Sequence, residues 1–129
     1  MTKATAITLP RIHSSYAGGE VMGVVGGLDG QPDYLLIDMG EAPDDLSWDE
    51  AMKWAAAREG ESLPTRREQA VMFGNRREGQ YQKRWYWSCE QYAGYDASAW
   101  CQTFDDGGQY YDRKDYEYRA RAVRRVPFR

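Results

Sequence analysis

Residues that carry out catalysis or bind metal ions are scarce in this chain. It contains two cysteines, Cys89 and Cys101, and one histidine, His13. The cysteines lack the Cys-x-x-Cys spacing of structural zinc sites. A Ser-His-Asp triad would need His13, which falls in an irregular N-terminal segment, and no glycine-rich phosphate loop precedes a helix. The sequence therefore predicts a protein that is not an enzyme and that uses neither metal nor cofactor.

Long hydrophobic runs are also lacking. No apolar stretch approaches the ~18 residues that a membrane helix needs. Residues 1–9 contain one lysine and no apolar segment of the length found in signal peptides. We therefore expect a protein made in the cytoplasm without a signal peptide and with no membrane span. Whether Cys89 and Cys101 pair stays open, but reduced thiols packed as small hydrophobic groups are favoured.

Neither sign of charge is in large excess. The 17 basic and 20 acidic side chains give a net charge of −3, so the balance does not indicate a nucleic-acid partner. Arginines do gather at 66–67, at 76–77 and over residues 119–129. This pattern fits either a local anion site or a solvated face, and we favour the solvated face.

What the chain has is glycine and aromatic residues, with 13 glycines and 14% aromatics in 129 residues. This length suits one domain with a real core. Residues 1–19 read as an N-terminal arm or lead-in, and residues 20–129 as a single domain. Residues 21–25 and 34–39 read as strands of an N-terminal hairpin around the glycine-rich turn at 26–30.

Two helices are expected to follow the hairpin. Ser47 and Glu50 form a capping box before apolar residues at helical spacing, and Gly60 is the expected end of this helix. Thr65 and Glu68 form a second capping box, and the helix that they open should end at residues 74–75.

Strands follow from residue 85 to the end. Residues 99–104 and 109–112 are expected to pair around the Asp-Asp-Gly-Gly turn at 105–108. Residues 118–126 form the closing strand, with Arg119 and Arg121 expected to point outward. The alternation breaks between Val123 and Arg124, which indicates a bulge or a change of exposure. The whole is an α+β layout in which the last strand returns to the early hairpin.

Several short motifs support a family resemblance. They are Leu-Pro-Thr-Arg-Arg-Glu at 63–68, Trp-Tyr-Trp-Ser at 85–88, Ala-Trp at 99–100 and Arg-Ala-Arg-Ala-Val-Arg-Arg at 119–125. With them, residues 20–126 resemble the C-type-lectin-like fold, and more closely the small bacterial and phage domains of the DUF1566 family, related to the C-terminal domain of the Legionella collagen-like adhesin. The resemblance implies a phage or prophage origin and no single activity; the adhesin relatives suggest sulfated glycans as ligands.

Calcium-dependent sugar binding and cysteine chemistry are both disfavoured. A Gln-Pro-Asp string at 31–33 resembles a lectin calcium motif, but it falls in the early hairpin and reads as a turn. The acidic pairs 44–45 and 105–106 fit a helix lead-in and a hairpin turn better than a cation site. The formylglycine-generating enzymes of the same fold need a reactive, exposed cysteine pair, which Cys89 and Cys101 do not resemble.

Tyrosines outside the expected core are the best candidates for binding. Trp85, Trp87, Trp100 and Phe104 read as core, whereas tyrosine in connectors offers contact area at low entropic cost. The candidate residues lie in the connector 90–98 and around 110–117: Tyr92, Tyr95, Asp96, Tyr110, Tyr111, Arg113 and Tyr116.

Two hypotheses follow. The first is a non-enzymatic binding module, encoded by a phage or prophage, that recognises a protein or a surface glycan without calcium. The alternative is a structural virion component, such as a capsid decoration or tail-associated protein, which contacts other virion subunits. A homo-oligomer is compatible with either, and the protein would be made in the host cytoplasm and in the second case carried in the virion.

Overall fold

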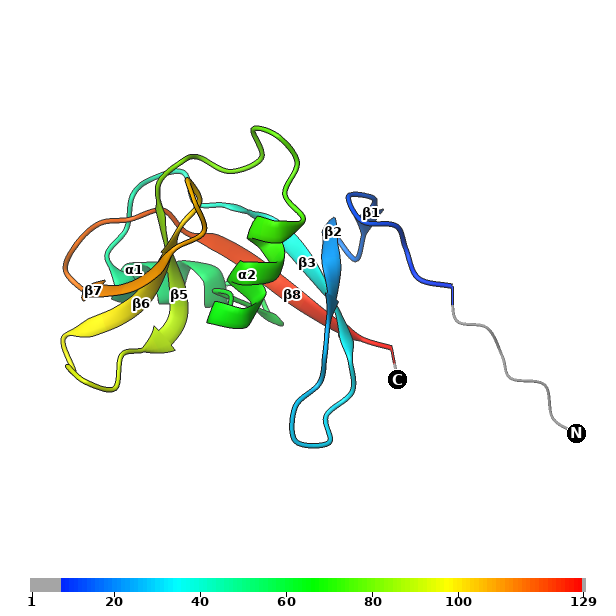
Figure 1. Cartoon of the computed structure of the whole chain (residues 1–129), viewed down its shortest axis with the longest axis horizontal. Coiled ribbons are helices and arrows are strands. Elements are labelled where there is room, and N and C mark those ends of the chain that lie inside the picture. The colour runs from blue at the N-terminus through cyan, green and yellow to red at the C-terminus, as the bar shows by residue number, and fades with distance from the viewer. Residues whose placement is uncertain (1–7, 129) are drawn as a thin grey trace, which may run out of the picture.

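The computed structural model describes residues 8–128 of the chain. It shows a mixed α+β fold with two antiparallel sheets and two helices, which confirms the predicted α+β layout. The five-stranded sheet has the order β1-β2-β3-β8-β4, and the three-stranded sheet has the order β5-β6-β7. Helix α2 lies between the two sheets in Figure 1, and it contacts β2 of one sheet and both β5 and β6 of the other.

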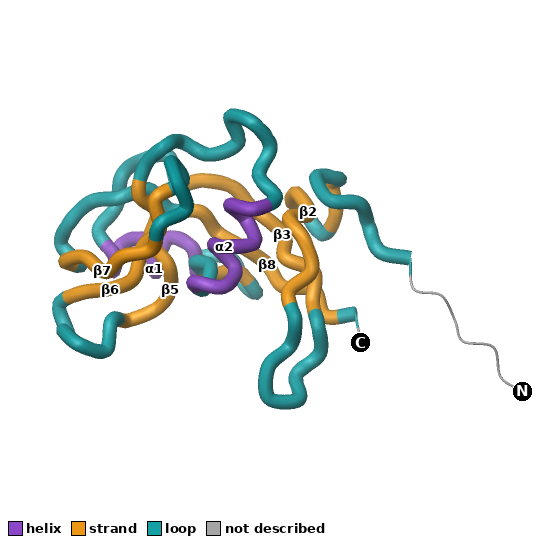
Figure 2. Tube along the Cα trace, viewed as in Figure 1, coloured by secondary structure: helices purple, strands orange, loops and turns teal. Residues whose placement is uncertain are grey.

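The elements have the following bounds. The strands are β1 (Ser15–Tyr16), β2 (Gly19–Val25), β3 (Tyr34–Glu41), β4 (Glu61–Ser62), β5 (Trp85–Gln91), β6 (Ser98–Thr103), β7 (Gln109–Arg113) and β8 (Arg121–Pro127), and the helices are α1 (Trp48–Ala56) and α2 (Arg66–Gly74). Residues 26–33 project beyond the sheet as the β2–β3 loop, seen at the bottom of Figure 2. No helix among residues 8–128 is long and apolar enough to span a membrane.

The ordered sheet begins before residue 20. Of the predicted lead-in, residues 1–7 lie outside the described part of the chain. Within the rest, Ser15 pairs with Glu20 and Tyr16 with Gly19, so that β1 forms one edge of the five-stranded sheet.

Both helices start at the predicted capping boxes. In α1 the Ser47 side chain accepts from the Glu50 backbone N–H, and the Glu50 carboxylate accepts from the Ser47 N–H. Thr65 and Glu68 repeat this arrangement in α2. The predicted end of the first helix at Gly60 is wrong, because α1 ends at Ala56. Gly60 has a φ of +80° in the turn that leads into β4, a conformation that glycine adopts without steric cost.

The outward position predicted for Arg119 is also wrong. Its residue surface is 6% exposed, because its guanidinium donates to Glu41 and Asp45 at 2.9 Å each and to the carbonyl of Ala42. Arg121 donates to Asp38 at 2.9 Å. The alternation of the closing strand shows which side chains share a face. It does not show that carboxylates of neighbouring segments bind the arginines on that face.

Strand β8 lies between β3 and β4 in the interior of its sheet. It begins at Arg121 instead of residue 118, because Tyr118 forms an isolated bridge with Leu46. The irregularity expected near Val123 is present on the partner strand. The register shifts between Asp38 and Gly40 of β3, opposite Val123 and Ala122. The bulge thus adds a residue to β3 and leaves β8 regular.

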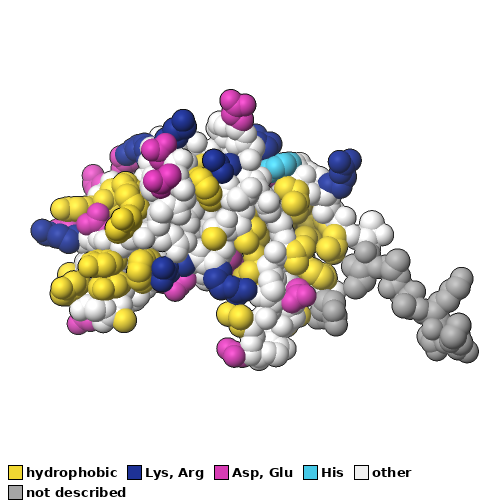
Figure 3. Space-filling view, viewed as in Figure 1, with side chains coloured by type: hydrophobic (Ala, Val, Ile, Leu, Met, Phe, Trp, Pro, Cys, Tyr) yellow, Lys and Arg dark blue, Asp and Glu magenta, His cyan; other side chains and the backbone are white. Residues whose placement is uncertain are grey.

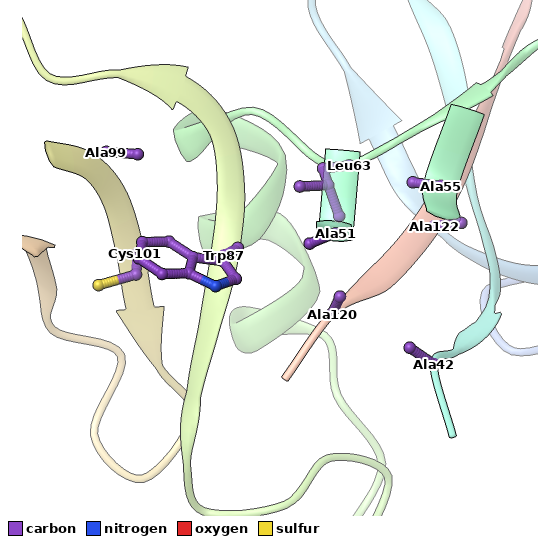
Figure 4. Packing of buried hydrophobic residues seen from close by; sticks show 9 residues of the cluster. All are labelled: Ala42, Ala51, Ala55, Leu63, Trp87, Ala99, Cys101, Ala120 and Ala122. Atoms are coloured by element: carbon purple, nitrogen blue, oxygen red, sulfur yellow. The ribbon is translucent and has the colours of Figure 1, made fainter. Parts of the chain in front are cut away.

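The main core is built around Trp87, which is fully buried. Figure 4 shows its ring beside Cys101 of β6 and across from small side chains of α1 and β8. The indole N–H donates to the carbonyl of Leu46 at 2.9 Å. A second buried cluster, which includes Met72 of α2 and Phe104, lies between α2 and the two sheets. These contacts fix the three-stranded sheet against the rest of the domain.

Candidate functional site

The predicted binding residues fall on two faces of the three-stranded sheet. Trp100 of β6 pairs with Tyr111 of β7, and Cys101 pairs with Tyr110. Because successive side chains of a strand point to opposite faces, Tyr110 and Tyr111 lie on opposite sides. The structure therefore does not gather all the predicted residues into one site.

Four rings form a group on the Tyr111 side, which we name the tyrosine cluster: Tyr92, Tyr95, Trp100 and Tyr111. Tyr92 and Tyr111 are stacked, with ring centroids 3.8 Å apart and planes at 9°. Tyr95 lies 5.9 Å from Tyr92, and Trp100 meets Tyr92 edge-on at 5.4 Å. Tyr95 and Tyr111 nevertheless remain 63% and 42% exposed. The cluster thus packs internally and still presents aromatic surface to solvent.

Arg66 of α2 covers one side of this cluster. Its guanidinium carbon lies 3.5 Å from the centre of the Trp100 ring, and its Nε donates to Gln109 Oε1 at 3.0 Å. The Gln109 amide in turn donates to the Arg66 carbonyl and to Gln102. Sequence reasoning missed Arg66 and Gln109 as site residues. The Leu-Pro-Thr-Arg-Arg-Glu motif marked the helix start, but nothing in the sequence pairs it with Trp100.

The other predicted residues are not part of the tyrosine cluster, although Arg113 lines a hollow together with Tyr95 and Tyr111. Tyr110, 63% exposed, meets Trp85 edge-on at 5.7 Å. Arg113, at the end of β7, forms an exposed ion pair with Asp115 at 2.6 Å, and its guanidinium is 5.7 Å from the Tyr116 ring. Asp96 is exposed in the β5–β6 connector, where its backbone carbonyl accepts from the Gln91 side chain.

A groove of about 1300 Å³ lies beside the cluster, between the β2–β3 loop, the start of α2 and the strands β6 and β7. Figure 3 shows basic side chains between the hydrophobic side chains over β5–β7 at the left and the β2–β3 loop. The lining of the groove includes Arg66, Arg67 and Arg125. Arg67 donates to the carbonyl of Gly26 at 3.1 Å. Glu90 occupies the helix start, where its carboxylate accepts from the Arg66 N–H at 2.7 Å.

Arg125 is already paired inside this groove. It donates to both carboxylate oxygens of Glu68, at 2.6 and 2.7 Å. Tyr34 also donates to Glu68, at 2.5 Å. Burial and this hydrogen bond raise the pKa of Tyr34 to about 12. The expected solvated face of arginines near the end of the chain is therefore wrong for Arg119, Arg121 and Arg125. Each is bound to a carboxylate of an earlier segment.

The cysteines and the acidic pairs have structural surroundings. Both thiols are free, and burial raises the pKa of Cys101 to about 12, so this thiol is protonated at neutral pH and is a poor nucleophile. Asp45 is bound by Arg84 and Arg119. Asp106 accepts from the Gly108 N–H in the hairpin turn. Residues 8–128 contain no group of three or more His, Cys, Asp or Glu side chains placed to hold a metal ion.

No family model matches the sequence, and no curated protein matches it in a sequence search. Inference about function therefore depends on the tyrosine cluster, the groove and their immediate neighbours.

Proposed function

We propose that this protein is a non-enzymatic binding module that recognises a protein or a surface glycan through the tyrosine cluster, without calcium. The observation that carries the proposal is the packed group of four rings in which Tyr95 and Tyr111 stay exposed. Tyrosine combines apolar area with a hydroxyl, and it loses little conformational entropy on binding. Because the rings already support one another, little further ordering is needed when a ligand binds.

We also propose a C-type-lectin-like fold and a phage or prophage origin. The sequence motifs suggest both. The order of two helices followed by an aromatic sheet supports the fold, as does the return of β8 to β3. In such a fold, loops and exposed strands carry binding while the rest is scaffold. The β5–β6 connector and β7, which supply Tyr92, Tyr95 and Tyr111, fit that division of roles.

The test is a binding screen with matched variants. The purified chain is applied to a glycan array and to a panel of bacterial surface proteins, with and without EDTA. We expect binding that survives EDTA and that falls at least about tenfold in Tyr95→Ala and Tyr111→Ala. Tyr16→Ala is the control, because Tyr16 is 43% exposed on β1, outside the tyrosine cluster. Binding that needs calcium, or that both cluster variants retain, would refute the proposal.

Mass spectrometry of purified phage particles tests the alternative. Stoichiometric copies in the particle would make this chain a virion component, with the tyrosine cluster as its contact to another subunit or to a receptor. Absence from particles would direct the search for a partner to the host cytoplasm.

A further inference from the structure

Strand β7 lies at the edge of the three-stranded sheet and pairs only with β6 among the described residues. Backbone hydrogen bonds at both ends of this pairing show which residues of β7 bond to β6. The Thr103 N–H donates to the Gly108 carbonyl at 2.9 Å, and the Lys114 N–H donates to the Ala97 carbonyl at 2.8 Å. Since hydrogen-bonded pairs alternate along an antiparallel ladder, the backbone groups of Tyr110 and Asp112 face β6. Those of Gln109 and Tyr111 face away from it.

These outward groups are unpaired within residues 8–128, since neither the N–H nor the carbonyl of Gln109 or Tyr111 forms a backbone hydrogen bond outside the sheet. The backbone groups of Arg113, which also face away from β6, already have hydrogen-bond partners. Its N–H donates to Asp112 and its carbonyl accepts from the Tyr116 N–H. The free stretch therefore has room for a short added strand that exchanges hydrogen bonds at Gln109 and Tyr111.

The end strands of the five-stranded sheet are short, and the outer side of β5 is already hydrogen-bonded. The five-stranded sheet ends in β1 and β4, which have two residues each. On the outer side of β5, the Trp87 N–H donates to the Arg119 carbonyl at 3.0 Å, and the Cys89 N–H donates to the Pro64 carbonyl at 2.9 Å. Proteins usually protect strand edges in such ways, because an open edge pairs with other chains. Strand β7 lacks such protection at Gln109 and Tyr111, so its open edge is available to a partner.

The side chains beside this edge indicate the chemistry of that partner. On the Tyr111 face, the Arg66 guanidinium is held by the Trp100 ring and by Gln109, a residue of β7 itself. Among the described residues, no carboxylate lies within 4 Å of its side-chain nitrogens. A guanidinium fixed in this way is arranged to bind a carboxylate. On the opposite face, Tyr110 and Trp85 offer an aromatic surface.

We infer that β7 binds an extended acidic segment of a partner protein as an added strand, with one Asp or Glu of that segment reaching Arg66. The inference rests on the proposed binding function and specifies its ligand. A second copy of this chain fits less well. The Tyr111 face of β7 carries Gln109, Tyr111 and Arg113, which supply no carboxylate for Arg66. Backbone pairing would supply affinity, and the side chains on either side of the edge would supply selectivity.

The test begins with a displayed library of random eight-residue peptides, selected on the full chain. We expect the selected peptides to share one Asp or Glu and to alternate in side-chain character. A selected peptide is then measured by fluorescence anisotropy. Its affinity should fall about tenfold or more in Arg66→Met, which removes a charge-assisted contact. It should be unchanged in the control Arg77→Met, whose guanidinium pairs with Glu20 of β2 in the other sheet.

Methylation of single peptide nitrogens tests the strand itself. It should abolish binding at alternate positions, where the peptide N–H groups face Gln109 and Tyr111, and be tolerated at the positions between. Binding that tolerates methylation at every position, or that is unchanged in Arg66→Met, would overturn the inference. Failure to select any peptide would also overturn it. In that case EDTA-resistant glycan binding lost in Tyr95→Ala would leave the proposed function standing, whereas failure of both screens would end both.

Discussion

The ion pair between the buried Glu68 of α2 and Arg125 of β8 allows a quantitative test of how α2 is joined to the five-stranded sheet. The Glu68 carboxylate is fully buried and accepts from Arg125, Tyr34 and the Thr65 N–H. Glu68→Gln keeps the shape of this side chain but removes its charge. Removing one partner of a buried ion pair costs ~3–5 kcal/mol. The Arg125 side chain is 32% exposed, so water relieves part of its charge and we expect the lower end, about 3 kcal/mol.

The measurement is urea unfolding followed by tryptophan fluorescence. With a slope of about 1.5 kcal/mol per molar urea, the expected loss lowers the midpoint by about 2 M. Arg113→Met is the control, because both members of its ion pair with Asp115 are more than 60% exposed, and we expect a change below about 0.5 kcal/mol. Adding Arg125→Met to Glu68→Gln should recover stability, since the uncompensated charge is then gone. Strictly additive losses would refute this account of the pair.

Four further outcomes follow from the structure. Trp87→Ala should unfold the domain or cost ~3–5 kcal/mol, which circular dichroism and thermal denaturation measure, because its ring fills the centre of the core. Tyr95→Ala should leave the melting temperature within about 1 °C, since this ring is mostly exposed; a large drop would show that it is core. Burial raises the pKa of Glu68, but the hydrogen bonds from Arg125 and Tyr34 outweigh burial, so the net effect is a lowered pKa. The ionised Glu68 therefore stabilises the fold above about pH 4.5, and this stability should be lost as the pH falls further. Burial raises the pKa of Cys101 to about 12, so the contribution of the protonated thiol to folding stability should persist up to pH 9.0 and be lost as the pH rises toward 12. Urea unfolding midpoints, measured over the pH ranges given for Glu68 and for Cys101, check both pH dependences.

The features that the sequence predicts well are those that depend on neighbours along the chain. The capping boxes at Ser47 and Thr65 involve residues three positions apart, so the helix starts are visible in the sequence. The glycine at 107, with a φ of +83°, likewise marks the hairpin turn between β6 and β7. Local chemistry decides these features, and the fold class follows from their order.

The features that the sequence does not reveal depend on distant contacts. Arg119 and Glu41 are 78 positions apart, and an alternating strand with arginines reads as solvent-facing unless its partner is known. The tyrosine cluster shows the same limit. The tyrosines are recognisable as candidates, but which of them lies beside Trp100 depends on the register of β6 and β7. The role of Arg66 depends on the approach of α2 to Trp100.

The interior position of β8 also has a consequence for synthesis of the protein. Residues 121–127 are the last described strand to leave the ribosome, yet they lie between β3 and β4 and complete the sheet. Until they emerge, the buried side chains of β3, such as Leu36 and Ile37, lack their neighbour on that side. Folding must therefore wait for nearly all of the described chain, and the nascent form exposes an apolar strand edge. A premature stop before residue 121 should yield a product that proteases and chaperones treat as unfolded.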